Sequence, residues 1–140
     1  VVWFTRGWRW QRELSMGRLS GQWDVSVGRW RVPQRAGAVI TPWVTQVGLT
    51  PVFRLQPRGW SDRWLIEGGI GLNWLSPIYR NHNKQFSTSF NFGDHLALVR
   101  RLGTGGEQEL ALRFQHFSNG RIRKPNPGEN FLQLRYAQRF

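Results

Sequence analysis

The 140-residue sequence contains no cysteine. A disulfide framework and a thiolate metal site are therefore excluded, and the redox compartment cannot be inferred. The sequence also lacks any apolar run near the roughly 18 residues that a membrane-spanning helix needs. No composition shift divides the chain, so we expect residues 1–140 to form a single domain. The chain opens at Val1 without a basic and apolar leader, which predicts a mature or trimmed chain from which any export signal is already gone.

Acidic residues are scarce: the sequence has 8 Asp and Glu against 20 Lys and Arg, which gives a formal net charge of +12. Lysine occurs only at Lys84 and Lys124, so the positive charge is almost entirely arginine. The planar guanidinium of arginine suits bidentate binding of phosphate. The charge balance thus predicts an anionic partner, and nucleic acid, anionic lipid and a phosphorylated glycolipid all qualify.

Nine Trp and nine Phe are a high aromatic load for a small chain, and they lie in segments where apolar and polar residues alternate. This period-2 pattern predicts strands. We expect eight of them, near residues 1–14, 18–32, 39–55, 63–74, 85–92, 95–102, 107–118 and 132–140.

The expected fold is all-β, an eight-stranded antiparallel transmembrane β-barrel, which is the smallest size usual in the bacterial outer membrane. In such a barrel the apolar face of each strand points to lipid. The polar face points into a narrow lumen filled by side chains, here Asp24, Glu67, Asn73, Arg113, Gln115 and Arg135.

A soluble lipocalin-like barrel reverses this orientation, and alternation alone does not exclude it. Two features favour the membrane form. Tryptophans such as Trp10, Trp30, Trp43 and Trp74 lie toward strand ends, as in interfacial aromatic girdles. The chain also ends in an amphipathic strand with a terminal Phe140, which resembles the C-terminal signal of outer-membrane barrel proteins.

His116 and Ser118 continue the apolar face of the segment 107–118, two residues apart. Polar residues on a lipid-facing surface are costly, which makes them candidates for function. A histidine can act as general base toward a serine hydroxyl when a carboxylate orients it. With both termini periplasmic, the pair would lie in the outer leaflet. The alternative is that this His-x-Ser sequence is purely structural.

The connection after Ser118 carries further candidates. Its only carboxylate is Glu129, which could reach His116 across a hairpin. The backbone N–H groups of Asn119 and Gly120, or the Asn119 amide, are natural donors to an oxyanion. Three cations of the same loop would lie beside the phosphates of an outer-leaflet glycolipid, and these are Arg121, Arg123 and Lys124.

The run Leu112-Arg113-Phe114-Gln115-His116-Phe117-Ser118-Asn119-Gly120, followed by Pro125-Asn126-Pro127-Gly128-Glu129-Asn130, resembles the signature of the PagL-type lipid A 3-O-deacylases. The specific match covers about the last 35 residues. Those proteins are eight-stranded outer-membrane barrels with a Ser-His-Glu triad on the outward face.

The resemblance implies a serine esterase that hydrolyses the 3-linked hydroxyacyl ester of lipid A without a metal or cofactor. Ser118 would be the nucleophile, His116 the base and Glu129 the orienting acid, with Asn119 and Gly120 beside the oxyanion. Phe114 and Leu112 would hold the acyl chain. The sequence departs from the family at one point, because some members place the acid one residue later relative to the Pro and Gly of the loop, where this chain has Asn130, on the same face as His116. Glu129 would need a local bulge or loop conformation to point outward.

Two other functions stay open at this stage. A non-enzymatic structural or adhesin-type outer-membrane barrel would carry His116 and Ser118 without using them. A soluble basic barrel could bind single-stranded nucleic acid through stacked aromatics and arginine, but aromatics recur around every strand and not in one groove. We therefore expect lipid A and outer-membrane lipid as partners and no nucleic acid, and a homodimer remains open.

Overall fold

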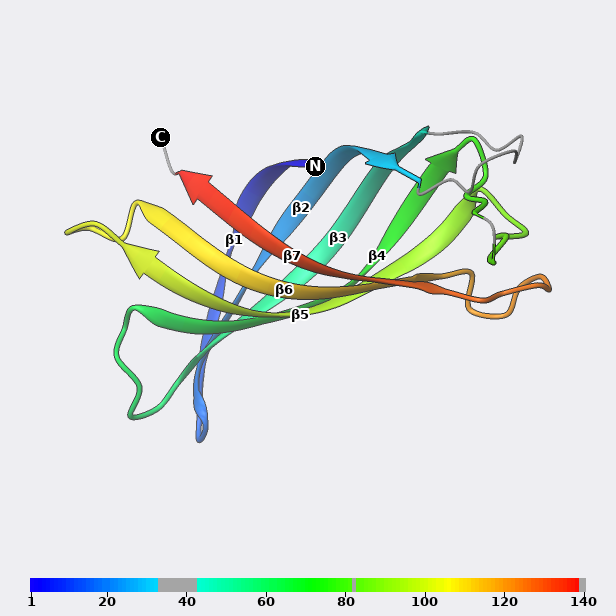
Figure 1. The fold of residues 1–140 in the computed structure, drawn as a ribbon. Coiled ribbons are helices and arrows are strands. Elements are labelled where there is room, and N and C mark those ends of the chain that lie inside the picture. Colours follow the sequence, from blue (N-terminus) through cyan, green and yellow to red (C-terminus); the bar gives the residue numbers. More distant parts are fainter. Residues whose placement is uncertain (33–42, 82, 139–140) are drawn as a thin grey trace.

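Seven antiparallel strands make up the fold in the computed structural model, which describes residues 1–32, 43–81 and 83–138 (Figure 1). The strands are β1 (Val2–Leu14), β2 (Gly17–Arg31), β3 (Trp43–Pro57), β4 (Trp64–Ser76), β5 (Phe90–Leu102), β6 (Gln108–Ser118) and β7 (Glu129–Gln138). Each strand pairs with the next along the chain in one sheet. The ends of two expected strands, residues 39–42 and 139–140, lie outside the described residues.

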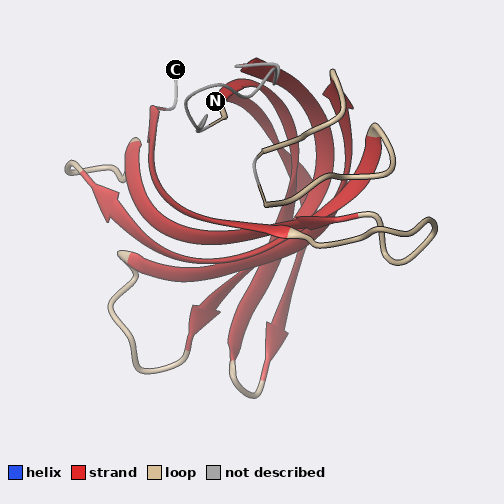
Figure 2. Ribbon diagram, turned by 45° about the vertical axis from the view of Figure 1, so that its right-hand side comes forward, coloured by secondary structure: helices blue, strands red, loops and turns tan. Residues whose placement is uncertain are grey.

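The expected count of eight strands and the closed barrel are wrong for the described residues. The sheet curves strongly but is open, with β1 and β7 as its two edges (Figure 2). The segments expected as separate strands at 85–92 and 95–102 contain a single strand, β5, and residues 85–89 belong to the loop before it. Gly93 and Asp94 resemble a turn in sequence but continue the strand. A Cβ on Gly93 would lie 2.4 Å from Asn73 Nδ2, so glycine is there for close packing.

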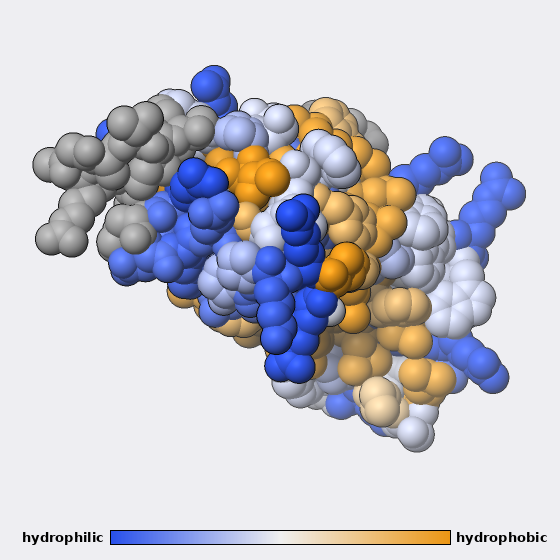
Figure 3. Space-filling view, turned by 90° about the vertical axis from the view of Figure 1, so that its right-hand side faces the viewer, coloured by the Kyte–Doolittle hydropathy of each residue, from blue (hydrophilic) through white to orange (hydrophobic). Residues whose placement is uncertain are grey.

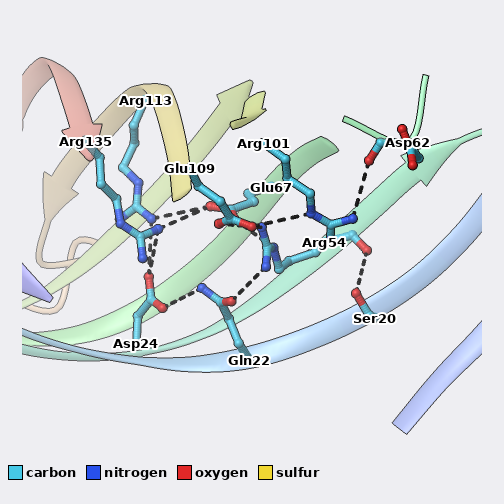
Figure 4. A network of polar contacts seen from close by, with 10 residues as sticks. All are labelled: Ser20, Gln22, Asp24, Arg54, Asp62, Glu67, Arg101, Glu109, Arg113 and Arg135. Atoms are coloured by element: carbon cyan, nitrogen blue, oxygen red, sulfur yellow. Dashed lines mark hydrogen bonds and ion pairs between the residues drawn. The ribbon is translucent and has the colours of Figure 1, made fainter. Parts of the chain in front are cut away.

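The inner side of the sheet is polar, as the alternation predicted. All six residues expected to face the lumen are buried. Glu67 is central to their network, with Arg54 Nε at 2.8 Å, Arg135 Nη1 at 3.4 Å and Arg113 Nη2 at 3.7 Å (Figure 4). Asp24 binds Arg113 and Arg135 from the opposite wall. Buried charges persist because each has oppositely charged partners.

The outer side of the sheet is apolar. Large hydrophobic side chains are exposed there along every strand from β1 to β7, among them Phe4, Trp23, Leu49, Leu72, Leu96, Leu112 and Leu134. Charges inside and hydrophobics outside are the reverse of a soluble barrel, so the lipocalin-like alternative is excluded. Among the described residues there is no helix long and apolar enough to cross a membrane.

A small aromatic core fills the end of the sheet where the β4–β5 loop (residues 77–89) and the β6–β7 loop (residues 119–128) meet. Trp30 packs edge-on against Phe117, with ring centroids 4.7 Å apart, and Tyr79 and Phe86 from the β4–β5 loop join the cluster. Trp30 is therefore buried and does not belong to an exposed aromatic girdle, which corrects the expectation for this residue. The core holds the β4–β5 loop beside the candidate site, and Ser87 of that loop contacts Asn119 and Arg123 of the β6–β7 loop.

Candidate active site

His116 and Ser118 lie near the end of β6, on the outer side of the sheet, and both are half-buried. The strand register sets their neighbours. On β5, Asp94 is opposite His116 and Phe92 is opposite Ser118. On β7, Asn130 is opposite His116. Side chains directly opposite one another on the same side of a sheet are within contact distance.

The imidazole of His116 is held on two sides. Its Nδ1 lies 2.6 Å from Asn130 Oδ1, so with the proton on Nδ1 the ring donates to the amide oxygen. Its Cε1 edge rests against Gly128, where an added Cβ would lie only 2.7 Å away. Gly128 also has a φ of 64°, a left-handed conformation that favours glycine. This arrangement leaves Nε2 available to a neighbouring hydroxyl.

Ser118 is followed immediately by a tight turn. The N–H of Ile122 donates to the carbonyl of Asn119 at 3.1 Å, and the two central residues, Gly120 and Arg121, have φ of 62° and 66°. Two consecutive positive φ values are typical of a type I′ turn. The turn brings the Gly120 N–H to 3.4 Å from Ser118 Oγ. A backbone donor therefore points at the candidate nucleophile.

Asn119 has a different place from the one expected for an oxyanion donor. Its backbone N–H donates to Asn126 Oδ1 at 3.0 Å. Its side-chain amide donates to Ser87 Oγ at 2.9 Å and to the carbonyl of Arg123 at 2.7 Å. Asn119 is also buried. Its donors thus tie the β6–β7 loop to itself and to the β4–β5 loop, and of the two expected donors it is Gly120 that faces Ser118.

Glu129 is not brought to His116. It is opposite Phe117 in the register and points to the inner side of the sheet. There its carboxylate accepts from the Tyr79 hydroxyl at 2.8 Å and from Lys84 Nζ at 3.0 Å. Burial, together with the hydrogen bond and negative charge of Glu129, raises the pKa of Tyr79 to about 12. The three residues form a clamp between β7 and the β4–β5 loop.

Exposed cations surround this end of the molecule. Arg121, Arg123 and Lys124 are all exposed in the loop that follows Ser118. Figure 3 looks onto this end and shows hydrophilic side chains gathered beside a hydrophobic flank. The site thus lies where a basic surface meets an apolar one.

An apolar groove of about 510 Å³ runs along the outer side of the sheet next to the site. Phe114, two residues before His116, and Gly68 on β4 both line it. Asp94 also lines it. Leu112, the other residue expected to hold an acyl chain, is exposed on the same side of β6.

Sequence reasoning missed several residues around the site. Asp94 was hidden because its strand was divided at Gly93-Asp94. Asn126 contacts Asn119 within the β6–β7 loop, Ser87 connects that loop to the β4–β5 loop, and Tyr79 contacts Glu129 at the start of β7. No local sequence pattern indicates these contacts. Asn130 was not missed, because the alternation already placed it on the same side as His116.

The inverted polarity of the sheet and the His-Ser pair on its apolar side define a class: a membrane β-sheet protein with a candidate serine–histidine site on its apolar side. The family model described as "Lipid A 3-O-deacylase (PagL)" matches residues 1–139. The chain therefore belongs to the PagL family.

Known members agree with this assignment. The chain is 37% identical to lipid A deacylase PagL of Bordetella bronchiseptica over 98 residues, which are 69% of this chain and 51% of that protein. It is 28% identical to lipid A deacylase PagL of Pseudomonas aeruginosa over 132 residues, 92% of this chain and 72% of that one. A crystal structure of the outer membrane enzyme PagL superposes with a TM-score of 0.81 at 25% identity, covering 99% of this chain and 87% of the other. The chain thus spans about half the length of the Bordetella relative.

Proposed function

We propose that this chain is a lipid A 3-O-deacylase, a serine esterase whose site faces the outer leaflet of the outer membrane. The observation that carries the proposal is the placement of His116 and Ser118 on the apolar side of the sheet, with the Gly120 N–H directed at Ser118 Oγ. Membership of the deacylase family supports the substrate class.

The reaction has two halves. Ser118 Oγ attacks the carbonyl carbon of the 3-linked ester while His116 Nε2 takes the hydroxyl proton. The Gly120 N–H stabilises the negative charge that develops on the carbonyl oxygen. The bond from the acyl carbon to the sugar oxygen then breaks, and His116 returns the proton to the departing sugar hydroxyl. Water attacks the acyl-enzyme by the same route and releases the hydroxy fatty acid.

The surroundings of the site suit this substrate. The groove lined by Phe114 and Gly68 offers an apolar channel for the acyl chain. Arg121, Arg123 and Lys124 supply exposed positive charge beside the serine, where the phosphates of lipid A can bind. One amphipathic molecule would contact both regions at once.

The test is to fold the chain in detergent, add purified lipid A and follow the glycolipid by mass spectrometry. We expect the loss of a single hydroxyacyl mass. Ser118→Ala should lower the rate by more than about 10⁴-fold because the nucleophile is gone. A folded parent that leaves lipid A intact would refute the substrate and favour the structural or adhesin-type alternative.

A further inference from the structure

The residues that follow the β6–β7 loop divide between the two sides of the sheet. Asn130 is exposed and opposite His116, whereas Glu129 is opposite Phe117 and points inward. The alternation of β7 is unbroken from Glu129 to Gln138, without the bulge that would turn Glu129 outward. A carboxylate at position 129 and an imidazole at position 116 therefore lie on opposite sides of the sheet.

Both carboxylate oxygens of Glu129 already have partners. Oε2 accepts from the Tyr79 hydroxyl at 2.8 Å, and Oε1 accepts from Lys84 Nζ at 3.0 Å. The side chain is largely buried, at 16% relative exposure. Breaking these contacts would leave a charge buried without its cation, which is costly. Glu129 is thus committed to holding the β4–β5 loop.

We infer that the third member of the catalytic group is the amide of Asn130 and not the carboxylate of Glu129. This inference rests on the proposed function and names the residue that orients its base. Asn130 Oδ1 accepts the Nδ1 proton of His116 at 2.6 Å, which fixes the tautomer with Nε2 free to take the proton of Ser118. An asparagine serves the same purpose in some cysteine proteases. Asn130 is a positioning residue, because it acts through His116.

A neutral amide orients the imidazole but adds no negative charge to stabilise the imidazolium. The groups facing His116 are few. Asp94 faces it from β5, Asn130 and the backbone of Gly128 lie on the β7 side, and Ser118 follows it on β6. Replacing Asn130 by Asp would add a second carboxylate, at hydrogen-bond distance. A carboxylate there favours the charged imidazolium, so the acid limb of the pH–rate profile should move to higher pH.

Covalent labelling of Ser118 by a small alkyl fluorophosphonate tests this directly, using the full chain folded in detergent. Ser118 Oγ attacks phosphorus, fluoride leaves, and His116 takes the proton, so the label reports the pair without needing lipid A. We expect Asn130→Ala to slow labelling by about 10- to 100-fold. Asn130→Asp should restore most of the rate and move the acid limb up by at least about one pH unit. Glu129→Gln should keep the acid limb of the parent.

The opposite pattern would overturn the inference: Glu129→Gln slows labelling as much as Asn130→Ala does, or Asn130→Asp leaves the acid limb in place. Nitrogen-15 NMR of the imidazoles gives a readout that needs no reaction. Asn130→Ala should change the Nδ1-to-Nε2 tautomer balance of His116, and an unchanged balance contradicts the assignment. Failure of the proposed function looks different. If the substrate is wrong, the parent protein leaves lipid A intact although Ser118 is labelled. If the nucleophile is wrong, Ser118 is not labelled, although Asn130→Ala still changes the tautomer balance of His116.

Discussion

At the residue scale, the position of the His116 ring depends on Gly128, because there is no room for a side chain at this position. A Cβ at Gly128 would lie 2.7 Å from the ring and would also strain a backbone at φ 64°. We expect Gly128→Ala to displace the ring and lower turnover by about 100-fold, since misplacing a catalytic group by about 1 Å costs that much. Turnover of lipid A measures the effect.

Gly59 provides a matched control for this substitution. It has a φ of 82° and lies in the β3–β4 connection, with no atom within 4 Å of an added Cβ. Gly59→Ala therefore imposes a similar backbone strain without touching the site. Equal losses of turnover in the two variants would mean that backbone strain, and not contact with His116, explains the effect at Gly128.

At the residue scale, the sequence predicted the side of the sheet on which His116 and Ser118 lie but not which residue orients the histidine. His116 and Ser118 stood out as polar residues on an apolar side, and the structure places them there. For the partner of His116 the two sequence signals disagreed. The family resemblance implied Glu129 and the alternation indicated Asn130, because moving one residue along a strand changes the side of the sheet. Glu129 has the negative charge expected of the orienting acid, whereas the side chain of Asn130 points to the side of the sheet where His116 lies. Only the register of β7 against β6 separates them.

At the scale of elements, the apolar groove lies beside Gly68 and Gly69, two positions of β4 without a side chain. Gly68 is open on the outer side of β4, with the nearest atoms to an added Cβ at 3.6 and 3.9 Å. Gly68→Leu should fill the groove without disturbing the strand, whereas Gly68→Ala should barely enter it. We expect lipid A hydrolysis to fall in the leucine variant only, while fluorophosphonate labelling of Ser118 stays unchanged. A parallel fall in labelling would show damage to the site and not to acyl binding.

The clamp between the β4–β5 loop and β7 makes a second prediction at this scale. The pKa of Tyr79 is raised from 10.0 to about 12 by burial and by Glu129. Because the folded pKa is raised, the stabilisation is complete below pH 10 and is lost as pH rises toward 12. In a Tyr136→Phe background Tyr79 is the remaining tyrosine, so its tyrosinate absorbance can be titrated alone.

We expect a titration midpoint near 12 in that background, and a lower midpoint once Glu129→Gln removes the charge. A midpoint near 10 in both proteins would contradict the clamp. The clamp was beyond sequence prediction because Tyr79 and Lys84 lie in the β4–β5 loop and Glu129 begins β7, and these segments meet only in the folded sheet.

On the scale of the whole molecule, the polar interior holds the sheet together. Glu67 is fully buried among Arg54, Arg113 and Arg135. Glu67→Gln leaves these guanidinium groups short of negative charge, and we expect it to lower the free energy of unfolding by about 3–5 kcal/mol. Urea denaturation in detergent measures this. Glu13→Gln, which removes the partner of an exposed Arg18, should leave the midpoint unchanged, and equal effects would argue against a structural interior network.

The overall organisation was largely predictable, and the reason is periodicity. Strands that alternate between lumen and lipid carry their polarity in every second residue, so the buried charges and exposed hydrophobics followed from sequence. The number of strands could not be predicted in the same way, because glycine and aspartate mark turns in most sequences, whereas here Gly93 allows close packing and Asp94 faces His116.

The two edge strands of the sheet, β1 and β7, have backbone groups without a partner strand. In a bilayer these backbone groups need hydrogen-bond partners.

The most direct test of the account is hydrolysis of lipid A in water labelled with oxygen-18, followed by mass spectrometry of both products. Attack of Ser118 on the ester carbonyl followed by water predicts one heavy oxygen in the released hydroxy fatty acid and none in the glycolipid. Ser118→Ala should yield neither product. Heavy oxygen in the glycolipid, or the same products from the Ser118→Ala variant, would contradict a serine esterase at this site.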